Sequence, residues 1–155
     1  MINLKEPISA DKVIVSVKAW ESIGYRESLT KVITLFASNA GLHCVIIVDP
    51  YDRFVGVITR NDILNWFRRK LVTISYNSLS DADKCIRLRN LINSAKVREV
   101  MSSNGSYAAI SPDDSLLHAL NLMAEFELTV LPVVDGSNRV IGARTLSDVL
   151  HPIIT

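Results

Sequence analysis

The chain has 155 residues, of which 48% are hydrophobic and 21% are charged, and its formal net charge at pH 7 is +1. A balanced charge argues against nucleic acid as the main partner, although short basic clusters occur at 68–70 and 84–89. No apolar run approaches the roughly 18 residues that a membrane-spanning helix needs, so a membrane protein is not expected.

The N-terminal segment MINLKEPISADK (1–12) lacks the basic region and apolar stretch of a secretory leader, and we therefore expect a cytoplasmic protein. The two cysteines, Cys44 and Cys85, match neither a disulfide nor a zinc spacing. We expect both to be reduced, packed side chains, and no metal site is predicted.

The first half of the chain is repeated in the second half. LHCVIIVDPYDRFVGVITRNDIL runs from Leu42 to Leu64 and returns as LTVLPVVDGSNRVIGARTLSDVL from Leu128 to Leu150, without a gap. An internal repeat indicates two units of the same architecture. In the first copy the identical positions are Leu42, Val48, Asp49, Arg53, Gly56, Thr59, Asp62 and Leu64.

Each copy is predicted to form a strand, a helix, two strands and a second helix. KVIV at 12–15 aligns with EVMS at 99–102, and WESI at 20–23 aligns with YAAI at 107–110. Apolar residues at helical spacing predict the first helix of each copy, at 27–37 and 114–124. A strand, a tight turn and a second strand follow, and a Thr-x-x-Asp sequence opens the last helix.

The segment between the copies is about 30 residues, which is long for a connection without structure of its own. Ser80 and Asp81 can cap a helix whose apolar set lies between 86 and 92, so a helix is predicted near 81–93. This helix could cover the core, support a dimer contact or receive a partner. The expected division is a first domain at 1–70, a connector at 71–95 and a second domain at 96–155.

Both copies resemble CBS domains, small βαββα modules that occur in tandem, and the pair resembles the Bateman module of regulatory subunits and regulated enzymes. The second copy carries the resemblance most fully, from its Val-x-x-Val-Met opening at 97–101 to the Asp-Val-Leu close at 148–150. The resemblance implies an α/β (α+β) fold of two βαββα subdomains related by pseudo-twofold symmetry. It also implies a homodimer, a regulated protein partner and an adenine nucleotide as ligand.

The two Thr-x-x-Asp sequences, Thr59 with Asp62 and Thr145 with Asp148, have two interpretations. Such a pair caps a helix, because the hydroxyl accepts from free backbone N–H groups and the acid suits the helix dipole. A carboxylate beside a hydroxyl also suits a ribose, whose adjacent hydroxyls can both donate to it. The CBS resemblance implies the ribose of an adenine nucleotide, and we expect this role in at least one copy.

Three basic residues are candidates for phosphate binding. His43 lies in a His-x-h-h-h-h-Asp pattern, where h is apolar, similar to that of the gamma subunit of AMP-activated kinase. Arg60 lies inside the first Thr-x-x-Asp sequence. Arg144 occupies an apolar strand where the first copy has Ile58, and a guanidinium there is costly unless it is paired or faces a cleft. A salt bridge or an extended path to solvent is the alternative for Arg144.

Adenine requires an apolar slot with backbone groups at its edge. The candidates are strand residues and the residue ahead of each first helix, although most of their area is expected to be core. They are Ile23, Cys44, Val45, Ile46, Ile110, Val130, Leu131 and Pro132. Pro132 has no N–H and could leave neighbouring carbonyls for a base edge.

The nucleotide-loop, zinc-protease and serine-hydrolase motifs are absent, and the three histidines lie far apart in the sequence. We therefore expect no catalytic activity and no required cofactor. The leading hypothesis is a sensor that binds AMP, ADP or ATP between its halves. The alternatives are a module for S-adenosylmethionine, which basic residues disfavour, and a purely structural interaction module without a ligand.

Overall fold

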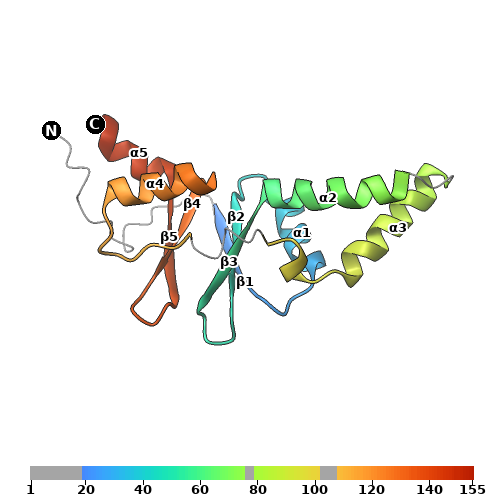
Figure 1. The fold of residues 1–155 in the computed structure, drawn as a ribbon, viewed down its shortest axis with the longest axis horizontal. Helices are drawn as coiled ribbons and strands as arrows, with labels where there is room; N and C mark the ends of the chain where they lie inside the picture. The colour runs from blue at the N-terminus through green and yellow to red at the C-terminus, as the bar shows by residue number, and fades with distance from the viewer. Residues whose placement is uncertain (1–18, 76–78, 102–107) are drawn as a thin grey trace.

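The computed structural model describes residues 19–75, 79–101 and 108–155. The aligned segment 12–15, residue 102 of its counterpart and Tyr107 lie outside these ranges. The first half follows the predicted βαββα order, as Figure 1 shows. Its elements are β1 (Trp20–Gly24), α1 (Leu29–Ser38), β2 (Cys44–Val48), β3 (Phe54–Thr59) and α2 (Arg60–Ser75).

The second half repeats this order with one difference. Its elements are α4 (Leu116–Phe126), β4 (Val130–Val134), β5 (Val140–Thr145) and α5 (Leu146–Ile154). Among the described residues, the counterpart of β1 is a single parallel bridge from Ile110 to Val133. Helix α3 (Asp81–Ser94) and the short 3₁₀ helix η2 (Val97–Glu99) connect the halves.

The antiparallel strand pair of each sheet has the same register and the same irregularity. β2 pairs with β1 in parallel and with β3 antiparallel, and β4 pairs antiparallel with β5. The register shifts between Ile47 and Val48, and again at the aligned position between Val133 and Val134. The predicted repeat therefore extends to the bulges of the strands.

The tight turns explain two of the residues that are identical in the two copies. Asp49 Oδ1 accepts from the backbone N–H of Tyr51 and of Arg53, at 2.8 and 2.9 Å. Asp135 accepts in the same way from Ser137 and Arg139, both at 2.9 Å. An Asp side chain that accepts from backbone N–H groups further along the chain stabilises a turn in this way. Arg53 and Arg139 also donate from Nε to Oδ2 of the same Asp, at 2.7 and 3.1 Å. The fold alone therefore accounts for both repeated residues.

Strand β2 is buried on both faces and joins the two cores of the molecule. Cys44, Ile46 and Val48 belong to a core shared with the second half. Val45 and Ile47 point the other way, into the core of the first half. A strand buried on both faces requires a continuous apolar run, which the sequence CVIIV supplies.

The halves exchange contacts between aligned residues. Phe54 N donates to Asn138 O at 2.8 Å, and Val140 N donates to Asp52 O at 2.9 Å. Arg53 and Arg139, which also align, form an antiparallel bridge. Because each contact is matched by its aligned counterpart, the two βαββα units are related by the expected pseudo-twofold axis.

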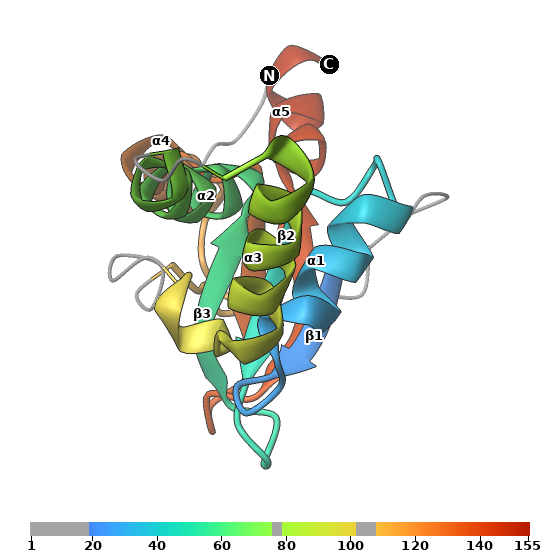
Figure 2. The ribbon, with the colours of Figure 1, turned by 90° about the vertical axis from the view of Figure 1, so that its right-hand side faces the viewer.

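Helix α3 lies beside α1 and α2 at one end of the molecule, as Figure 2 shows. It begins after Ser80, whose side chain accepts from Asp83 N, and it has no fully buried residue. Leu91 and Ile92 pack against the core of the first half. Cys85 is exposed on this helix, and its expected packing is therefore wrong. An exposed position is ordinary for a helix that covers the core with only one narrow face.

The two thiols should differ strongly in reactivity. Burial raises the pKa of the Cys44 thiol to about 12, so its reactive thiolate is scarce at pH 8, whereas Cys85 is exposed. We expect a thiol reagent to titrate Cys85 rapidly and Cys44 only as the protein opens. A Cys85→Ser variant should lose the rapid phase, and a rapid phase that persists in this variant would show that Cys44 is accessible.

Helix α4 ends in an unfavourable backbone conformation. Its C-cap residue Glu127 has φ 54° and ψ 46°, in the left-handed region. Glycine usually occupies this position because a Cβ there contacts the backbone. The side chain of Glu127 is therefore retained at a cost to stability.

Replacing Glu127 with Gly should raise the free energy of unfolding by about 0.5 to 1 kcal/mol, since glycine adopts the left-handed conformation readily. The matched control is Glu125→Gly, at an exposed position inside α4, which should lower that free energy by about as much. Urea denaturation measures both. Equal losses in the two variants would mean that the conformation of Glu127 carries no strain.

Candidate functional site

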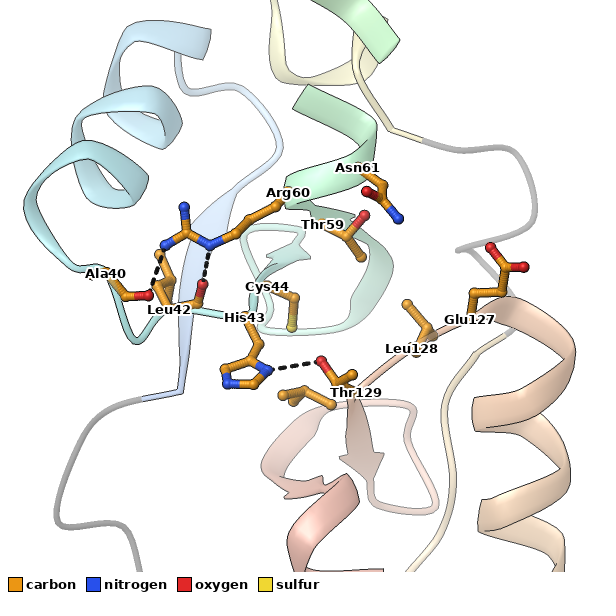
Figure 3. A pocket seen from close by; sticks show the side chains of 11 residues that line it. Ala40, Leu42, His43, Cys44, Thr59, Arg60, Asn61, Glu127, Leu128 and Thr129 are labelled. Atoms are coloured by element: carbon orange, nitrogen blue, oxygen red, sulfur yellow. Dashed lines mark hydrogen bonds between the residues drawn. The ribbon is translucent and has the colours of Figure 1, made fainter. Parts of the chain in front are cut away.

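Two adjoining cavities open between the first turn of α2 and the end of α4. Their volumes are about 290 and 480 Å³. They share Thr59, Asn61 and Glu127. Figure 3 shows the smaller cavity, with Thr59 and Asn61 on the α2 side and Glu127 on the α4 side. Residues from both copies therefore form one continuous site.

Thr59 and Asp62 form the wall at the start of α2. Asp62 Oδ2 accepts from Thr59 N at 2.8 Å and from Thr59 Oγ1 at 3.1 Å, and Asp62 N donates to Thr59 Oγ1 at 3.2 Å. Burial raises the pKa of the Asp62 carboxyl, against the hydrogen bonds from Thr59 that lower it. The pair caps the helix through Oδ2. Its Oδ1 atom is left for a further donor.

Thr145 and Asp148 form the same arrangement in the second copy. Asp148 Oδ2 accepts from Thr145 N at 3.0 Å, and Asp148 N donates to Thr145 Oγ1 at 3.1 Å. This is a complete capping box at the start of α5. Neither of the two cavities is lined by these residues. The copies therefore share the motif but differ in its surroundings.

His43 lines the smaller cavity and connects the two halves. Its Nδ1 atom lies 2.8 Å from Oγ1 of Thr129, the residue that aligns with it in the second copy. The bond therefore lies near the pseudo-twofold axis. A ligand that contacts His43 would also contact the junction between the halves.

Arg60 lines the smaller cavity, but most of its donors are used by the protein. Its Nε donates to Leu42 O at 2.9 Å, and its Nη2 donates to Asn39 O and Ala40 O at 2.9 and 3.2 Å. Its guanidinium also lies over the ring of Phe36. Arg60 thus ties the end of α1 to the start of α2, with Nη1 as the remaining group for a ligand.

Arg144 lies apart from the other two basic candidates. It is 3% exposed, pairs with Leu131 in the sheet and lines neither cavity. Its Nη1 makes a long contact of 3.5 Å to Ala143 O. The structure therefore brings His43 and Arg60 together but does not place Arg144 with them.

The apolar candidates for an adenine slot are divided between the cavity and the cores. Cys44 and Val130 line the smaller cavity. The other candidates are buried in the interior, and they are Ile23, Val45, Ile46, Ile110, Leu131 and Pro132. The carbonyl of Pro132 accepts from Ile110 N at 2.9 Å and so is used within the fold. Ala40, Leu42 and Leu128 complete the apolar wall of the cavity.

Several lining residues were missed by the sequence analysis. Asn61, Asn65 and Arg68 line the cavities along α2 at helical spacing from the Thr-x-x-Asp sequence. Arg68 Nη2 donates to Asn65 Oδ1. This spacing was a usable signal. Glu127 and Thr129 had none, because only the docking of the halves brings them to α2.

Neither a metal-binding cluster nor a helix able to span a membrane is found among the residues that the structure describes. No group of three or more His, Cys, Asp or Glu residues there is placed to hold a metal ion. None of the helices among these residues has the length and apolar character needed to cross a membrane.

One curated relative is an uncharacterized 33.4 kDa protein in the ribosomal RNA operon of Thermofilum pendens. It is 28% identical over 125 residues, which are 81% of this chain and 33% of the relative. The chain thus spans about a third of the length of that protein.

Four solved structures illustrate the likeness of the fold. CBSX2 from Arabidopsis thaliana has a TM-score of 0.66 at 17% identity, over 96% of this chain and 95% of that chain. CBSX2 in complex with AMP gives a TM-score of 0.58 at 18% identity, over 96% and 92%.

The cytosolic domain of the Mg²⁺ channel MgtE in complex with ATP has a TM-score of 0.58 at 21% identity, over 86% of this chain and 44% of that chain. A CBS domain pair in complex with 5′-methylthioadenosine and S-adenosyl-L-methionine has a TM-score of 0.62 at 17% identity, over 94% of this chain and 98% of that chain. At these identities the likeness concerns the fold alone.

The family is established by the sequence itself. The profile of the CBS domain matches residues 15–69 and again residues 97–154, which together make up most of the chain. These two matches coincide with the two βαββα units and with the repeat. The chain therefore belongs to the CBS domain family and is a tandem pair of CBS domains.

Proposed function

We propose that the cavities between α2 and α4 bind an adenine nucleotide, AMP, ADP or ATP, as a regulatory ligand and that the protein is not an enzyme. The observation that carries this proposal is the position of Asp62 on the cavity wall. Its Oδ2 atom is used by the helix cap, whereas Oδ1 has no hydrogen bond among the described residues. A half-buried carboxylate with one available oxygen suits the hydroxyls of a ribose.

The remaining walls supply the other parts of a nucleotide site. The apolar side chains of Leu42, Cys44 and Val130 would contact the base. His43 and the Nη1 atom of Arg60 would meet the phosphates in the smaller cavity, and Arg68 would meet them in the larger one. The site therefore offers an apolar surface, a carboxylate and cationic donors within a single opening.

A ligand in this position would touch both CBS domains. Asn61 and Thr59 come from the first domain, and Glu127 and Thr129 come from the second. A ligand shifts a conformational equilibrium by its difference in affinity between the two states. Occupancy could thus alter how the domains meet, and a homodimer partner or a regulated protein would detect that change.

The ligands of the similar structures support this class of compound. AMP, ATP, 5′-methylthioadenosine and S-adenosyl-L-methionine all contain adenosine. The ribose and base contacts proposed for this chain would be common to all of them. Phosphate number and charge would be distinguished by other residues.

S-adenosylmethionine is the second candidate ligand, and one observation favours it. The carboxylate of Glu127 lines both cavities, where it would attract a sulfonium or ammonium group and repel phosphate. His43, Arg60 and Arg68 favour phosphate instead. Direct comparison of the ligands decides between these two candidates.

The role of Asp62 in binding is tested by Asp62→Asn, with Asp148→Asn as the matched control. Loss of the ribose contact should weaken nucleotide binding by about 1 to 3 kcal/mol, which is roughly 5- to 150-fold in Kd. Both variants should fold, because the side-chain oxygen of Asn can still accept the backbone hydrogen bond from Thr59 N or Thr145 N. The measurement is titration calorimetry with AMP, ATP and S-adenosylmethionine, supported by ligand-induced shifts of Tm.

Asp148→Asn should leave the affinity close to that of the unchanged protein. The reverse pattern, with loss only in Asp148→Asn, would move the site to the second copy. If no adenosine compound binds the unchanged protein, the proposal fails and a purely structural role of the capping pairs is favoured.

The raised pKa of Asp62 predicts a dependence of stability on pH. A carboxyl whose pKa is higher in the folded state stabilises that state below the unfolded pKa, and this contribution is lost as pH rises through the folded pKa. Relative to Asp62→Asn, the unchanged protein should therefore lose stability as pH rises from below the ordinary pKa of an aspartate through the raised pKa of Asp62 in the folded state. Urea denaturation of both proteins at several pH values measures their free energies of unfolding. If the unchanged protein instead gains stability relative to Asp62→Asn as pH rises, burial does not disfavour the charged carboxylate.

A further inference from the structure

We propose that Glu127 is a specificity-determining residue that makes the cavity disfavour each additional phosphate on an adenosine ligand. This inference rests on the proposed function and adds to it the residue that discriminates among adenosine compounds by charge. It rests on the position of the side chain, on the pairing of the cations around it and on its backbone conformation.

Glu127 is the acidic residue that the two cavities have in common. It lies at the end of α4, across the opening from Thr59 and Asn61, as Figure 3 shows. Its side chain is exposed, and no hydrogen bond or ion pair joins it to another described residue. Among the described residues its charge is therefore not held in an ion pair, and it acts on whatever enters the opening together with the nearby cations.

The cations at the same opening are partly occupied by the protein. Arg60 donates to the carbonyls of Asn39, Ala40 and Leu42, and Arg68 donates to Asn65. Carbonyl oxygens are the negative ends of dipoles and lower the attraction of a guanidinium for a further anion. The electrostatic potential that a ligand meets at the opening consequently depends more on the carboxylate of Glu127 than a count of charges suggests.

The backbone conformation of Glu127 also supports a role at a ligand site. A residue with a Cβ is held at φ 54°, where glycine is the usual choice. Strained positions of this kind cluster at ligand sites. In the first copy the aligned residue is Gly41, so the carboxylate is also confined to one of the two copies.

The effect of Glu127 on affinity should increase with the charge of the ligand. A unit charge several ångströms from the ligand, in partly screened surroundings, changes the affinity by roughly three- to ten-fold for each charge on the ligand. Adenosine carries no charge and should not respond. AMP, ADP and ATP should be penalised in increasing order, whereas the cationic S-adenosylmethionine should gain.

The test compares Glu127→Gln with Glu125→Gln, which removes the same charge from an exposed position on α4 that lines neither cavity. Dissociation constants are measured for adenosine, AMP, ADP, ATP and S-adenosylmethionine at low salt with a chelator present. In Glu127→Gln we expect affinity to rise roughly three- to ten-fold for AMP and by more for ATP, to stay unchanged for adenosine and to fall for S-adenosylmethionine. The gain for ATP should shrink at high salt.

Two results would overturn the assignment. If the unchanged protein binds nucleotides but Glu127→Gln behaves like Glu125→Gln, the proposed function stands and the role of Glu127 is wrong. An equal gain for adenosine and ATP would mean that the substitution acts through shape or folding and not through charge. Absence of binding by every compound to the unchanged protein would instead overturn the proposed function, and the role of Glu127 with it.

Discussion

The burial of β2 on both faces is the constraint on which the rest of the molecule depends. One face of the strand packs into the core of the first half, and the other packs against the second half. The exchange continues at the ends of the repeats, since Val97 and Val100 pack in the core of the first half and Trp20 packs against the shared core. Neither CBS domain therefore completes its apolar core alone, which is expected for units of about 60 residues.

This packing creates the cavities. Docking of the two sheets brings the start of α2 in the first domain beside the end of α4 in the second, and the bond between His43 and Thr129 marks the junction. Pseudo-twofold symmetry repeats the Thr-x-x-Asp sequence but not its surroundings. Glu127, Asn65 and Arg68 give the first copy an opening with its own charges. The surroundings of the Thr-x-x-Asp sequence therefore differ between the two copies more than the sequence itself does.

The same side chains serve the fold and the candidate site. Asp62 caps α2 with one carboxylate oxygen, and the other has no hydrogen bond among the described residues and would be available to the proposed ligand. Arg60 ties two helices together with most of its donors. A site built from such groups is rigid before the ligand arrives, which lowers the entropic cost of binding. It also means that substitutions there must be judged for stability and for affinity separately.

The sequence by itself determined the βαββα order, the repeat, the capping pairs and the connector helix α3. These features depend on residues close together in the chain, through apolar periodicity, helix caps and turn chemistry. It also marked His43, Arg60 and Asp62. Only the tertiary structure decided that most adenine candidates lie in the cores, that Arg144 lies away from the cavities and that Glu127 faces α2. Those relations join residues distant in the chain, and they arise from the packing of one half against the other, for which no local pattern of residues exists.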